Sequence, residues 1–391
     1  MKILHVIPSV ALADGGPSRA IRLIAGGLVA RGIEVDVVST DAGMDTRKGD
    51  SCYEILADEF RPARLLLFPV NIGFYKISLQ LRDWLRAHVR NYDAVHIHAL
   101  FSWSSTVAAR AAIKASVPYI IRPLGTLNRY GIVHHRPLLK MLSLKLIESR
   151  LLSRAAYVHF TDSSEADEAA LLELDYRAAV IPLGVEDFQH EGNNPMIVMY
   201  PELQGKRVIL FLSRIAEKKN ITGLLKAFRI VQDRFPETRL VIAGDGQLSL
   251  VEKLRQLVDT LGLGKTVIWA GYVDGPHKHA LFDGAWMFVL PSFSENFGIA
   301  VAEALSAGLP CVLGEGVALS RSVAESGAGI SVDTSAESIA AGIDKILQND
   351  SLHASMEHNA LTLAQREYSI PAMSAALQDL YVESIKGKSS L

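Results

Sequence analysis

Two carboxylates in one short segment have the spacing to hold two parts of an extended ligand. Glu295 and Glu303 lie in SENFGIAVAEALSAGLP, which indicates a tight loop, a helix of about ten residues and a glycine stop. Eight residues of helix rise by about 12 Å, so the two side chains could bind separate hydroxyl-bearing groups. The N–H groups of Asn296, Phe297 and Gly298 would lie at the helix start, where unpaired N–H groups bind anions or hydroxyls. The alternative is a capping Glu295 and a solvated Glu303, although apolar neighbours disfavour exposure of Glu303.

Two cations follow an apolar segment in the same half of the chain. Arg214 comes directly after VILFLS, and Lys219 stands five residues later, ahead of an expected helix over Ile221–Phe235. Arginine binds phosphate through two parallel hydrogen bonds and lysine adds a point charge, so the pair suits a diphosphate. Taken alone, two solvated surface charges are the more common outcome.

A glycine-rich turn follows the first expected strand. The segment ADGGPS, residues 13–18, ends that strand and opens a helix, with Pro17 in its first turn. Glycine lets a phosphate approach the backbone closely, and Gly16 is the position that we expect to do so. A plain turn is the simpler alternative. The segment matches neither the dinucleotide fingerprint nor the GxxxxGK[ST] loop, which argues against a dehydrogenase or a kinase.

Two histidines end another expected strand, in the segment DAVHIH. His96 and His98 are two residues apart, so their side chains point to the same face of the strand. A metal site would need a third ligand, and none is evident nearby in the sequence. We therefore expect hydrogen-bonded histidines and no metal.

These residues follow apolar segments rich in valine and isoleucine, separated by helical patterns. The expected strands of the first half are Ile3–Ile7, Glu34–Ser39, Ala94–His98, Tyr119–Arg122, Tyr157–Phe160 and Val180–Pro182. Those of the second half are Val208–Ser213, Arg239–Ala243, Val267–Ala270, Met287–Pro291 and Cys311–Leu313. Such alternation is typical of parallel sheets with helices on both faces, and it predicts two doubly wound, Rossmann-like α/β domains in tandem.

Residues 184–206 lack periodicity and carry Gly, Asn and Pro, so they are the expected linker. We place an N-terminal domain at 1–190, a C-terminal domain at 191–370, and at 371–391 a C-terminal helix that returns to the first domain. Two such domains create a cleft, and ligands bind beyond the carboxyl ends of the strands. Most residues singled out above lie there.

Composition excludes several other classes of protein. The 391 residues carry a formal net charge of −2, which argues against a dedicated nucleic-acid binder. Cys52 and Cys311 are far apart and lack metal-ligand spacing. The N-terminal apolar segment is too short for a signal peptide, and no window approaches the roughly 20 apolar residues of a membrane span. We expect a cytoplasmic protein.

The motifs together resemble the family 4 retaining glycosyltransferases, which have the GT-B fold of two Rossmann-like domains facing across a cleft. The resemblance rests on Arg214 and Lys219, on AGDG at 243–246, and on the Glu295-x7-Glu303 motif with Phe297 and Gly298. It runs over nearly the whole chain and is more specific in the C-terminal half. Glycine is frequent in the family where this chain has Ser213, Asn220 and Asn296, which affects loop geometry more than chemistry.

In the C-terminal half, the resemblance implies that Arg214 and Lys219 neutralise the diphosphate of a nucleotide-sugar donor. Glu295 would hold sugar hydroxyls beside the N–H groups of Asn296, Phe297 and Gly298. Glu303 would accept hydrogen bonds from the ribose. The nucleobase would lie against the backbone of the run that contains Tyr272 and Val273.

In the N-terminal half, the resemblance implies that the Gly16 amide faces the diphosphate and that His98 reaches the donor sugar. Residues 122–128, RPLGTLN, follow a strand and would line the acceptor side. The donor would be a UDP- or GDP-sugar, which is a co-substrate, and no cofactor or metal is expected. The acceptor would be a glycan or a lipid-linked molecule, in polysaccharide or lipopolysaccharide biosynthesis.

Two alternatives remain open. A GT-B epimerase or phosphorylase would use the same cleft with water or phosphate, and a non-catalytic protein would only bind the sugar nucleotide. The phosphorylases of this fold that carry pyridoxal phosphate are much longer than this chain. The intact set of two cations and two carboxylates argues against a protein that only binds.

One further segment, residues 134–154, mixes Leu, Ile and Met with five Arg and Lys residues. A basic amphipathic helix of this kind lies on an anionic membrane surface, or it packs inward with solvated lysines. The sequence leaves open both interpretations, peripheral membrane contact and an ordinary packed helix.

Overall fold

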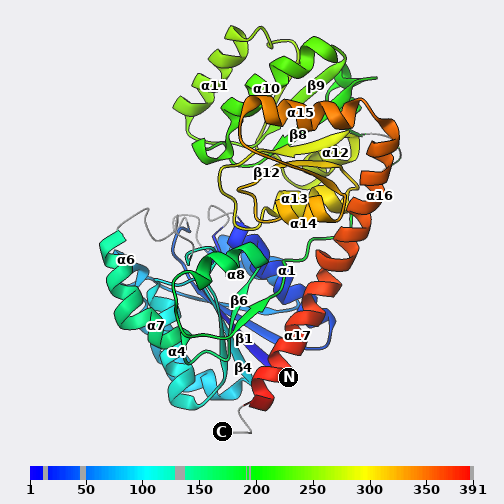
Figure 1. The fold of residues 1–391 in the computed structure, drawn as a ribbon. Helices are drawn as coiled ribbons and strands as arrows, with labels where there is room; N and C mark the ends of the chain where they lie inside the picture. Colours follow the sequence, from blue (N-terminus) through cyan, green and yellow to red (C-terminus); the bar gives the residue numbers. More distant parts are fainter. Residues whose placement is uncertain (12–15, 45–49, 128–136, 191, 193–194, 388–391) are drawn as a thin grey trace. The chain divides into compact units, whose positions relative to one another are not determined.

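The computed structural model describes residues 1–11, 16–44, 50–127, 137–190, 192 and 195–387. Two compact α/β units make up the chain (Figure 1). The first comprises Met1–Gly184 and Ile370–Leu391, and the second comprises Val185–Ser369. The second unit is therefore one continuous segment, and the first is completed by the end of the chain. The boundaries fall at 184 and 369, against 190 and 370 expected from the sequence.

The first unit is built on a seven-stranded parallel sheet with the order β3-β2-β1-β4-β5-β6-β7. The strands are β1 (Lys2–Ser9), β2 (Glu34–Thr40), β3 (Arg64–Phe68), β4 (Ala94–His98), β5 (Tyr119–Arg122), β6 (Tyr157–Phe160) and β7 (Ala178–Val180). Consecutive residues of β1, such as Ile3 and Leu4, are buried on opposite faces, as expected for a sheet covered on both sides.

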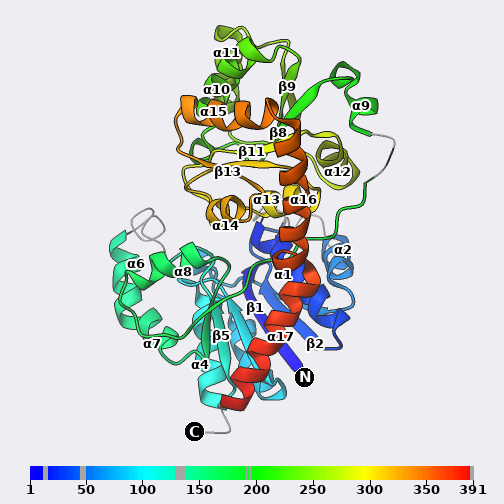
Figure 2. The same cartoon turned by 45° about the vertical axis from the view of Figure 1, so that its right-hand side comes forward.

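Helices cover both faces of this sheet. They are α1 (Gly16–Ala30), α2 (Asp50–Phe60), η3 (Phe74–Lys76), α3 (Leu79–His88), η4 (Val89–Asn91), α4 (Trp103–Ala115), α6 (Pro137–Ser143), the π-helix η5 (Leu144–Glu148), α7 (Ser149–Leu152), α8 (Ser163–Ala170) and α17 (Ile370–Gly387). The C-terminal α17 lies beside α1 (Figures 1 and 2). A Cβ on Gly27 of α1 would lie 2.7 Å from Ile370 Cγ2, so the two helices approach closely at this glycine.

The second unit has a six-stranded parallel sheet with the order β10-β9-β8-β11-β12-β13. Its strands are β8 (Arg207–Leu212), β9 (Thr238–Ala243), β10 (Val267–Gly271), β11 (Met287–Leu290), β12 (Cys311–Gly314) and β13 (Gly329–Val332). In each sheet the strand order runs outward in both directions from two adjacent central strands, β1 and β4 in the first sheet and β8 and β11 in the second. Such topological switch points are where doubly wound sheets bind ligands.

The helices of the second unit follow the same plan. They are α9 (Pro195–Met199), η6 (Pro201–Leu203), η7 (Glu217–Lys219), α10 (Ile221–Arg234), α11 (Leu248–Thr260), α12 (Gly275–Gly284), α13 (Ile299–Ser306), α14 (Ser320–Glu325), α15 (Ala336–Leu347) and α16 (Asp350–Glu367). The expected linker, residues 184–206, is not a structureless connection, because it contains α9 and η6.

Two strands, β3 and β13, were not predicted from the sequence. Both are the outermost strand of their sheet, and both are short, RLLLF and GISV. A buried run needs several consecutive apolar residues to stand out from a loop, and GISV offers too few. The strand expected at Val180–Pro182 forms two residues earlier, at Ala178–Val180.

Candidate functional site

An ion pair joins the two loops that leave the switch point of the second unit. Lys219 lies in η7, after β8, and is 4% exposed. Its Nζ contacts Oε2 of Glu295, which follows β11. Because β8 and β11 are adjacent, two predicted site residues that are 76 positions apart in the sequence meet at the carboxyl ends of these strands.

Positive charge accumulates around this pair. Burial, together with the nearby charges of Lys218 and Arg214, lowers the pKa of Lys219 below its ordinary value. Burial and Arg214 likewise lower the pKa of Lys218. The backbone N–H of Phe293 donates to the carbonyl of Lys218 at 2.8 Å, so the two loops are also tied through the main chain. Three crowded cations disfavour one another unless anions lie among them, and the Glu295 carboxylate is one such anion.

The loop that carries Glu295 is fixed by its own backbone. The Glu295 N–H donates to the carbonyl of Gly316 at 2.8 Å, and its carbonyl accepts from the N–H of Ala318 at 3.0 Å. The helix expected directly after Glu295 begins four residues later, at Ile299. Gly298 precedes it with φ 82°, a left-handed conformation that suits glycine and ends the loop.

This correction changes the place of three predicted donors. The N–H groups of Asn296, Phe297 and Gly298 belong to the loop before α13, not to its first turn. The Phe297 side chain is buried and packs edge to face on Tyr368, with 5.9 Å between ring centroids. Phe297 therefore anchors the loop to the core.

The AGDG segment at 243–246 has a structural reason for its glycines. A Cβ on Gly244 would lie 1.9 Å from the Ser213 carbonyl oxygen, and one on Gly246 would lie 2.2 Å from that of Ile215. These glycines let the loop after β9 contact the backbone of Ser213 and Ile215, the two neighbours of Arg214 in the chain.

The three positions where the family favours glycine differ from one another. Only Asn220 has a left-handed backbone, with φ 53°, while Ser213 and Asn296 do not have positive φ. Asn220 also caps α10, because its Oδ1 accepts from the N–H of Gly223 at 3.2 Å, and its Nδ2 donates to the carbonyl of Thr334 at 2.9 Å. Asparagine thus replaces glycine there and adds two hydrogen bonds.

Glu303 lies on α13 and is paired with a residue that the sequence analysis missed. Lys278 of α12 places its Nζ 3.0 Å from Glu303 Oε1, and both side chains are largely buried. Nothing in the sequence links two residues that come from different helices, so no local signal could have found Lys278. Tyr272 is 68% exposed and Val273 is buried, directly after β10.

In the first unit, Gly16 is the exposed first residue of α1, and residues 12–15 lie outside the described part of the chain. His98 ends β4, at the switch point, and is fully buried. The predicted segment 122–128 begins with Arg122 at the end of β5 and is described as far as Leu127.

The buried rings of His159 and His96 take part in a chain of three hydrogen bonds. His159 Nε2 lies 2.8 Å from the carbonyl of Ile181, so this nitrogen must carry the proton. His159 Nδ1 then accepts from His96 Nε2 at 3.3 Å. His96 Nδ1 in turn accepts from the Tyr381 hydroxyl of α17 at 2.8 Å. The neutral forms satisfy every contact, and burial lowers the pKa of His96 well below its ordinary value and that of His159 to about 3.

His98 belongs to a second contact, with His5 of β1. His5 Nδ1 and His98 Nε2 are 2.9 Å apart, while the other nitrogen of each ring has no hydrogen-bond partner among the described residues. His5, His96 and His98 offer ligand atoms within 4.8 Å of one another, so the fold brings beside the pair a third ring that is distant in the sequence. Burial lowers the pKa of all three rings, the charge of buried Arg122 lowers it further, and a cation there would meet the same repulsion.

The loops after β4 and β5 are held in uncommon conformations. Ala99 and Phe101 have φ of 79° and 53°, and Leu124 has φ 58°. The Phe101 N–H donates to Oε1 of Glu148 in η5 at 3.2 Å, and burial raises the pKa of Glu148 to about 7. The Gly125 N–H donates to Oε1 of Glu165 at 2.8 Å. Left-handed residues held by buried carboxylates are common beside ligand sites.

The described part of the basic segment, residues 137–154, contains α6, η5 and α7. A π-helical turn at Leu144–Glu148 therefore interrupts the helix that the sequence predicts for this segment. Among the described residues, no helix combines the length and apolar character needed to cross a membrane.

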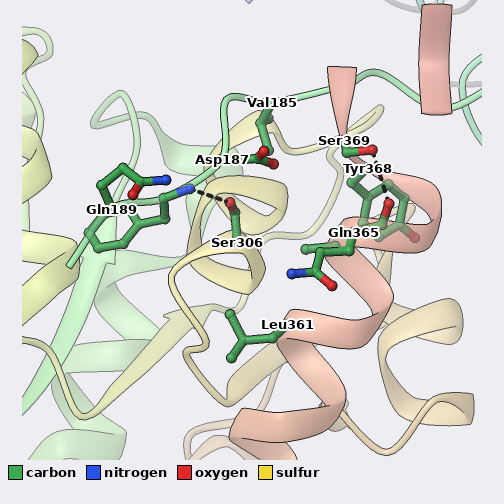
Figure 3. A pocket seen from close by; sticks show the side chains of 10 residues that line it. Val185, Asp187, Gln189, Ser306, Leu361, Gln365, Tyr368 and Ser369 are labelled. Carbon is green, nitrogen blue, oxygen red and sulfur yellow. Dashed lines mark hydrogen bonds between the residues drawn. The ribbon is translucent and has the colours of Figure 1, made fainter. Parts of the chain in front are cut away.

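A pocket of about 180 Å³ in the second unit contains none of the predicted site residues (Figure 3). Ser306 accepts a hydrogen bond from the N–H of Phe188 there, and Gln365 and Tyr368 of the α16 end face it. The pocket lies beside the segment that enters this unit, and neither Lys219 nor Glu295 lines it.

Comparison with known proteins gives a consistent picture. The model of the glycosyl transferase 4-like domain matches residues 15–184, and that of glycosyl transferases group 1 matches residues 199–362. This is the domain pair of the family 4 glycosyltransferases of GT-B fold, and it spans both units. The chain belongs to this family.

Among relatives of the family, the poly(glycerol-phosphate) alpha-glucosyltransferase of Bacillus subtilis is 31% identical over 46% of this chain and 26% of its own length. The D-inositol 3-phosphate glycosyltransferase of Paenarthrobacter aurescens is 27% identical over 82% of this chain and 81% of its own. The chain covers 26%, 42% and 60% of the first three curated relatives that it matches.

The fold is shared with solved structures. The Anabaena protein HepE, crystallised with UDP and glucose, superposes with a TM-score of 0.76 at 18% identity, and the match covers 100% of both chains. This likeness establishes the two-domain α/β GT-B fold of this family member.

Proposed function

We propose that this family 4 protein transfers a sugar from a UDP- or GDP-sugar to a glycan or lipid-linked acceptor with retention of configuration. The observation that carries the proposal is the Lys219–Glu295 ion pair at the β8/β11 switch point, next to Arg214. A cation and a sugar-binding carboxylate in contact suit the junction between a diphosphate and its sugar.

The remaining predicted contacts extend from this junction. Arg214, Lys219 and the Gly16 amide would bind the diphosphate, and Glu295 would hold sugar hydroxyls with the N–H groups of the loop at 296–298. Glu303 of α13 would accept hydrogen bonds from the ribose, and the base would lie along Tyr272 and Val273. His98 and the 122–128 loop would serve the sugar and the acceptor from the first unit.

In the proposed reaction, the acceptor oxygen bonds to the anomeric carbon on the face from which the diphosphate leaves. The bond from that carbon to the phosphate oxygen breaks, and the departing phosphate takes the acceptor proton. Cations aimed at the developing negative charge lower the barrier, so we propose a metal-independent enzyme without a cofactor. Activity that survives chelators would support this, and its loss would contradict it.

Substitution at the ion pair tests the assignment. We expect Glu295→Gln and Lys219→Met each to lower turnover by about 10²–10³-fold, since each removes an electrostatic contact to the reacting group. The matched controls are Glu252→Gln and Lys253→Met, two exposed residues of α11, and they should retain activity. Full activity in both site variants would refute the assignment.

The assay also separates the alternatives. Nucleotide release together with a glycosylated product indicates a transferase, and release without an acceptor product would favour the epimerase or phosphorylase alternative. A protein that is stabilised by UDP or GDP but releases nothing would be a binder. UDP is the first nucleotide to test, because HepE holds it.

The proposal includes a cellular setting. We infer a cytoplasmic enzyme of polysaccharide or lipopolysaccharide assembly that contacts the inner face of the membrane through residues 134–154. No nucleic-acid partner is proposed.

A further inference from the structure

A groove of about 400 Å³ runs along the first unit between α4 and the η5–α7 segment, which lie side by side in Figures 1 and 2. Its lining residues are Arg110, Ile113, Lys114, Leu146, Ile147, Arg150, Leu151 and Arg154. Arg110 and Lys114 lie in the second half of α4, which leads from the carboxyl end of β4 to the start of β5. The groove thus lies toward the amino ends of the strands, whereas His98 lies at the carboxyl end of β4.

The rim of the groove is positively charged. Arg110, Lys114, Arg150 and Arg154 are exposed, and none forms an ion pair with another described residue. No acidic residue lines the groove. The only carboxylate in residues 137–154, Glu148, is buried and accepts from the Phe101 N–H. Four cations without a counter-charge form a site for anionic groups.

The floor and the adjoining surface are apolar. Ile113, Ile147 and Leu151 line the groove together with the cations, and the Tyr119 hydroxyl donates to the Leu151 carbonyl at 2.6 Å. Beside the groove, four large side chains of α6 and η5 are between 54% and 60% exposed, namely Leu139, Met141, Leu142 and Leu146. So many exposed apolar side chains within eight residues mark an interaction surface.

We propose that the α4–α7 groove and this apolar strip dock on an anionic phospholipid bilayer. The lipid phosphates bind among the four cations, and the leucine and methionine side chains enter the boundary with the acyl chains. Basic residues beside exposed Leu and Met match an interfacial contact, whereas a free phosphate or a nucleic acid would use the cations alone. The inference rests on the proposed membrane setting and adds α4, which the sequence analysis did not include.

Vesicle co-sedimentation of the whole chain tests the proposal. The probes are vesicles of phosphatidylcholine alone and of phosphatidylcholine mixed with phosphatidylglycerol. The test variant is Arg110→Glu/Arg150→Glu, and a second variant, Leu142→Ser/Leu146→Ser, removes apolar side chains without changing the charge. The matched control is Lys253→Glu/Lys265→Glu, which changes the net charge equally on exposed positions of the second unit.

We expect the wild type to bind the mixed vesicles, and binding to weaken as salt is added. Loss of a surface cation should weaken binding about fivefold, so the double charge variant should lose more than tenfold. The serine variant should also bind less, and the control should bind as the wild type does. Equal binding by wild type and charge variant, an equal loss in the control, or no preference for the anionic vesicles would overturn the proposal.

Stabilisation by UDP, measured on the same variants without vesicles, keeps this outcome separate from that of the proposed reaction. A chain that binds UDP but not vesicles would contradict the docking surface alone. A chain that binds vesicles but shows no transfer would contradict the proposed reaction alone.

Discussion

Each of the two carboxylates that opened the sequence analysis is held by a lysine from another element. Lys219 of η7 contacts Glu295, and Lys278 of α12 contacts Glu303. Each carboxylate lies against an ammonium group, so both are suited to accept hydrogen bonds from hydroxyl groups. In the proposed reaction, the two carboxylates would act by orientation and charge, as a clamp on sugar and ribose hydroxyls.

Lys278 is therefore expected to position Glu303. In Lys278→Met, the largely buried Glu303 carboxylate loses its charged partner, and we expect UDP to bind about 5- to 30-fold more weakly, equivalent to about 1–2 kcal/mol. Lys278→Arg keeps the charge and should restore most of the affinity. Titration calorimetry measures both. Tighter binding by the methionine variant would show instead that Lys278 competes with the nucleotide for Glu303.

At the scale of elements, the sequence predicted the strands that form the centre of each sheet. These strands are buried on both faces, so their consecutive residues are apolar and many are valine or isoleucine. The ends of β8 and β11 could be predicted as site loops for the same reason. The edge strand β13 could not, since GISV is short and apolar on too few positions, and β3 was missed although four of the five residues in RLLLF are apolar. The partners Lys278 and His5 could not either, because they approach the site from elements distant in the sequence.

The α1–α17 contact gives a prediction for two adjacent glycines. A Cβ on Gly26 meets nothing within 4 Å, so Gly26→Ala should stabilise the first unit by about 0.5–1 kcal/mol through helix propensity. A Cβ on Gly27 would lie 2.7 Å from Ile370 Cγ2 and 3.2 Å from Ser374 Cβ. Gly27→Ala should therefore be less stable than Gly26→Ala by about 1 kcal/mol or more.

Thermal unfolding of the two variants checks this, and each serves as the control for the other. Equal stabilisation by both substitutions would mean that α17 yields at this contact without a measurable loss.

For the whole molecule, the division of the chain has a consequence for stability. The second unit is a continuous segment that contains Arg214, Lys219, Glu295 and Glu303, whereas the first depends on α17 for its cover. That helix buries Met373, Leu377 and Tyr381, and the Tyr381 hydroxyl donates to the His96 chain. Each buried side chain of this size contributes about 1.5–3 kcal/mol, a large part of the roughly 5–15 kcal/mol of a domain.

A chain that ends at Ser369 should accordingly lose the structure of the first unit and keep the second. We expect backbone amides of β1 and β4 to lose protection from hydrogen exchange, while those of β8 and β11 keep it and UDP still stabilises the protein. The milder variant Tyr381→Phe leaves the buried His96 Nδ1 without its donor and should destabilise only the first unit, by about 1–3 kcal/mol. Loss of protection in both sheets after truncation would show that the second unit needs the first in order to fold, and that donor binding cannot be assigned to it alone.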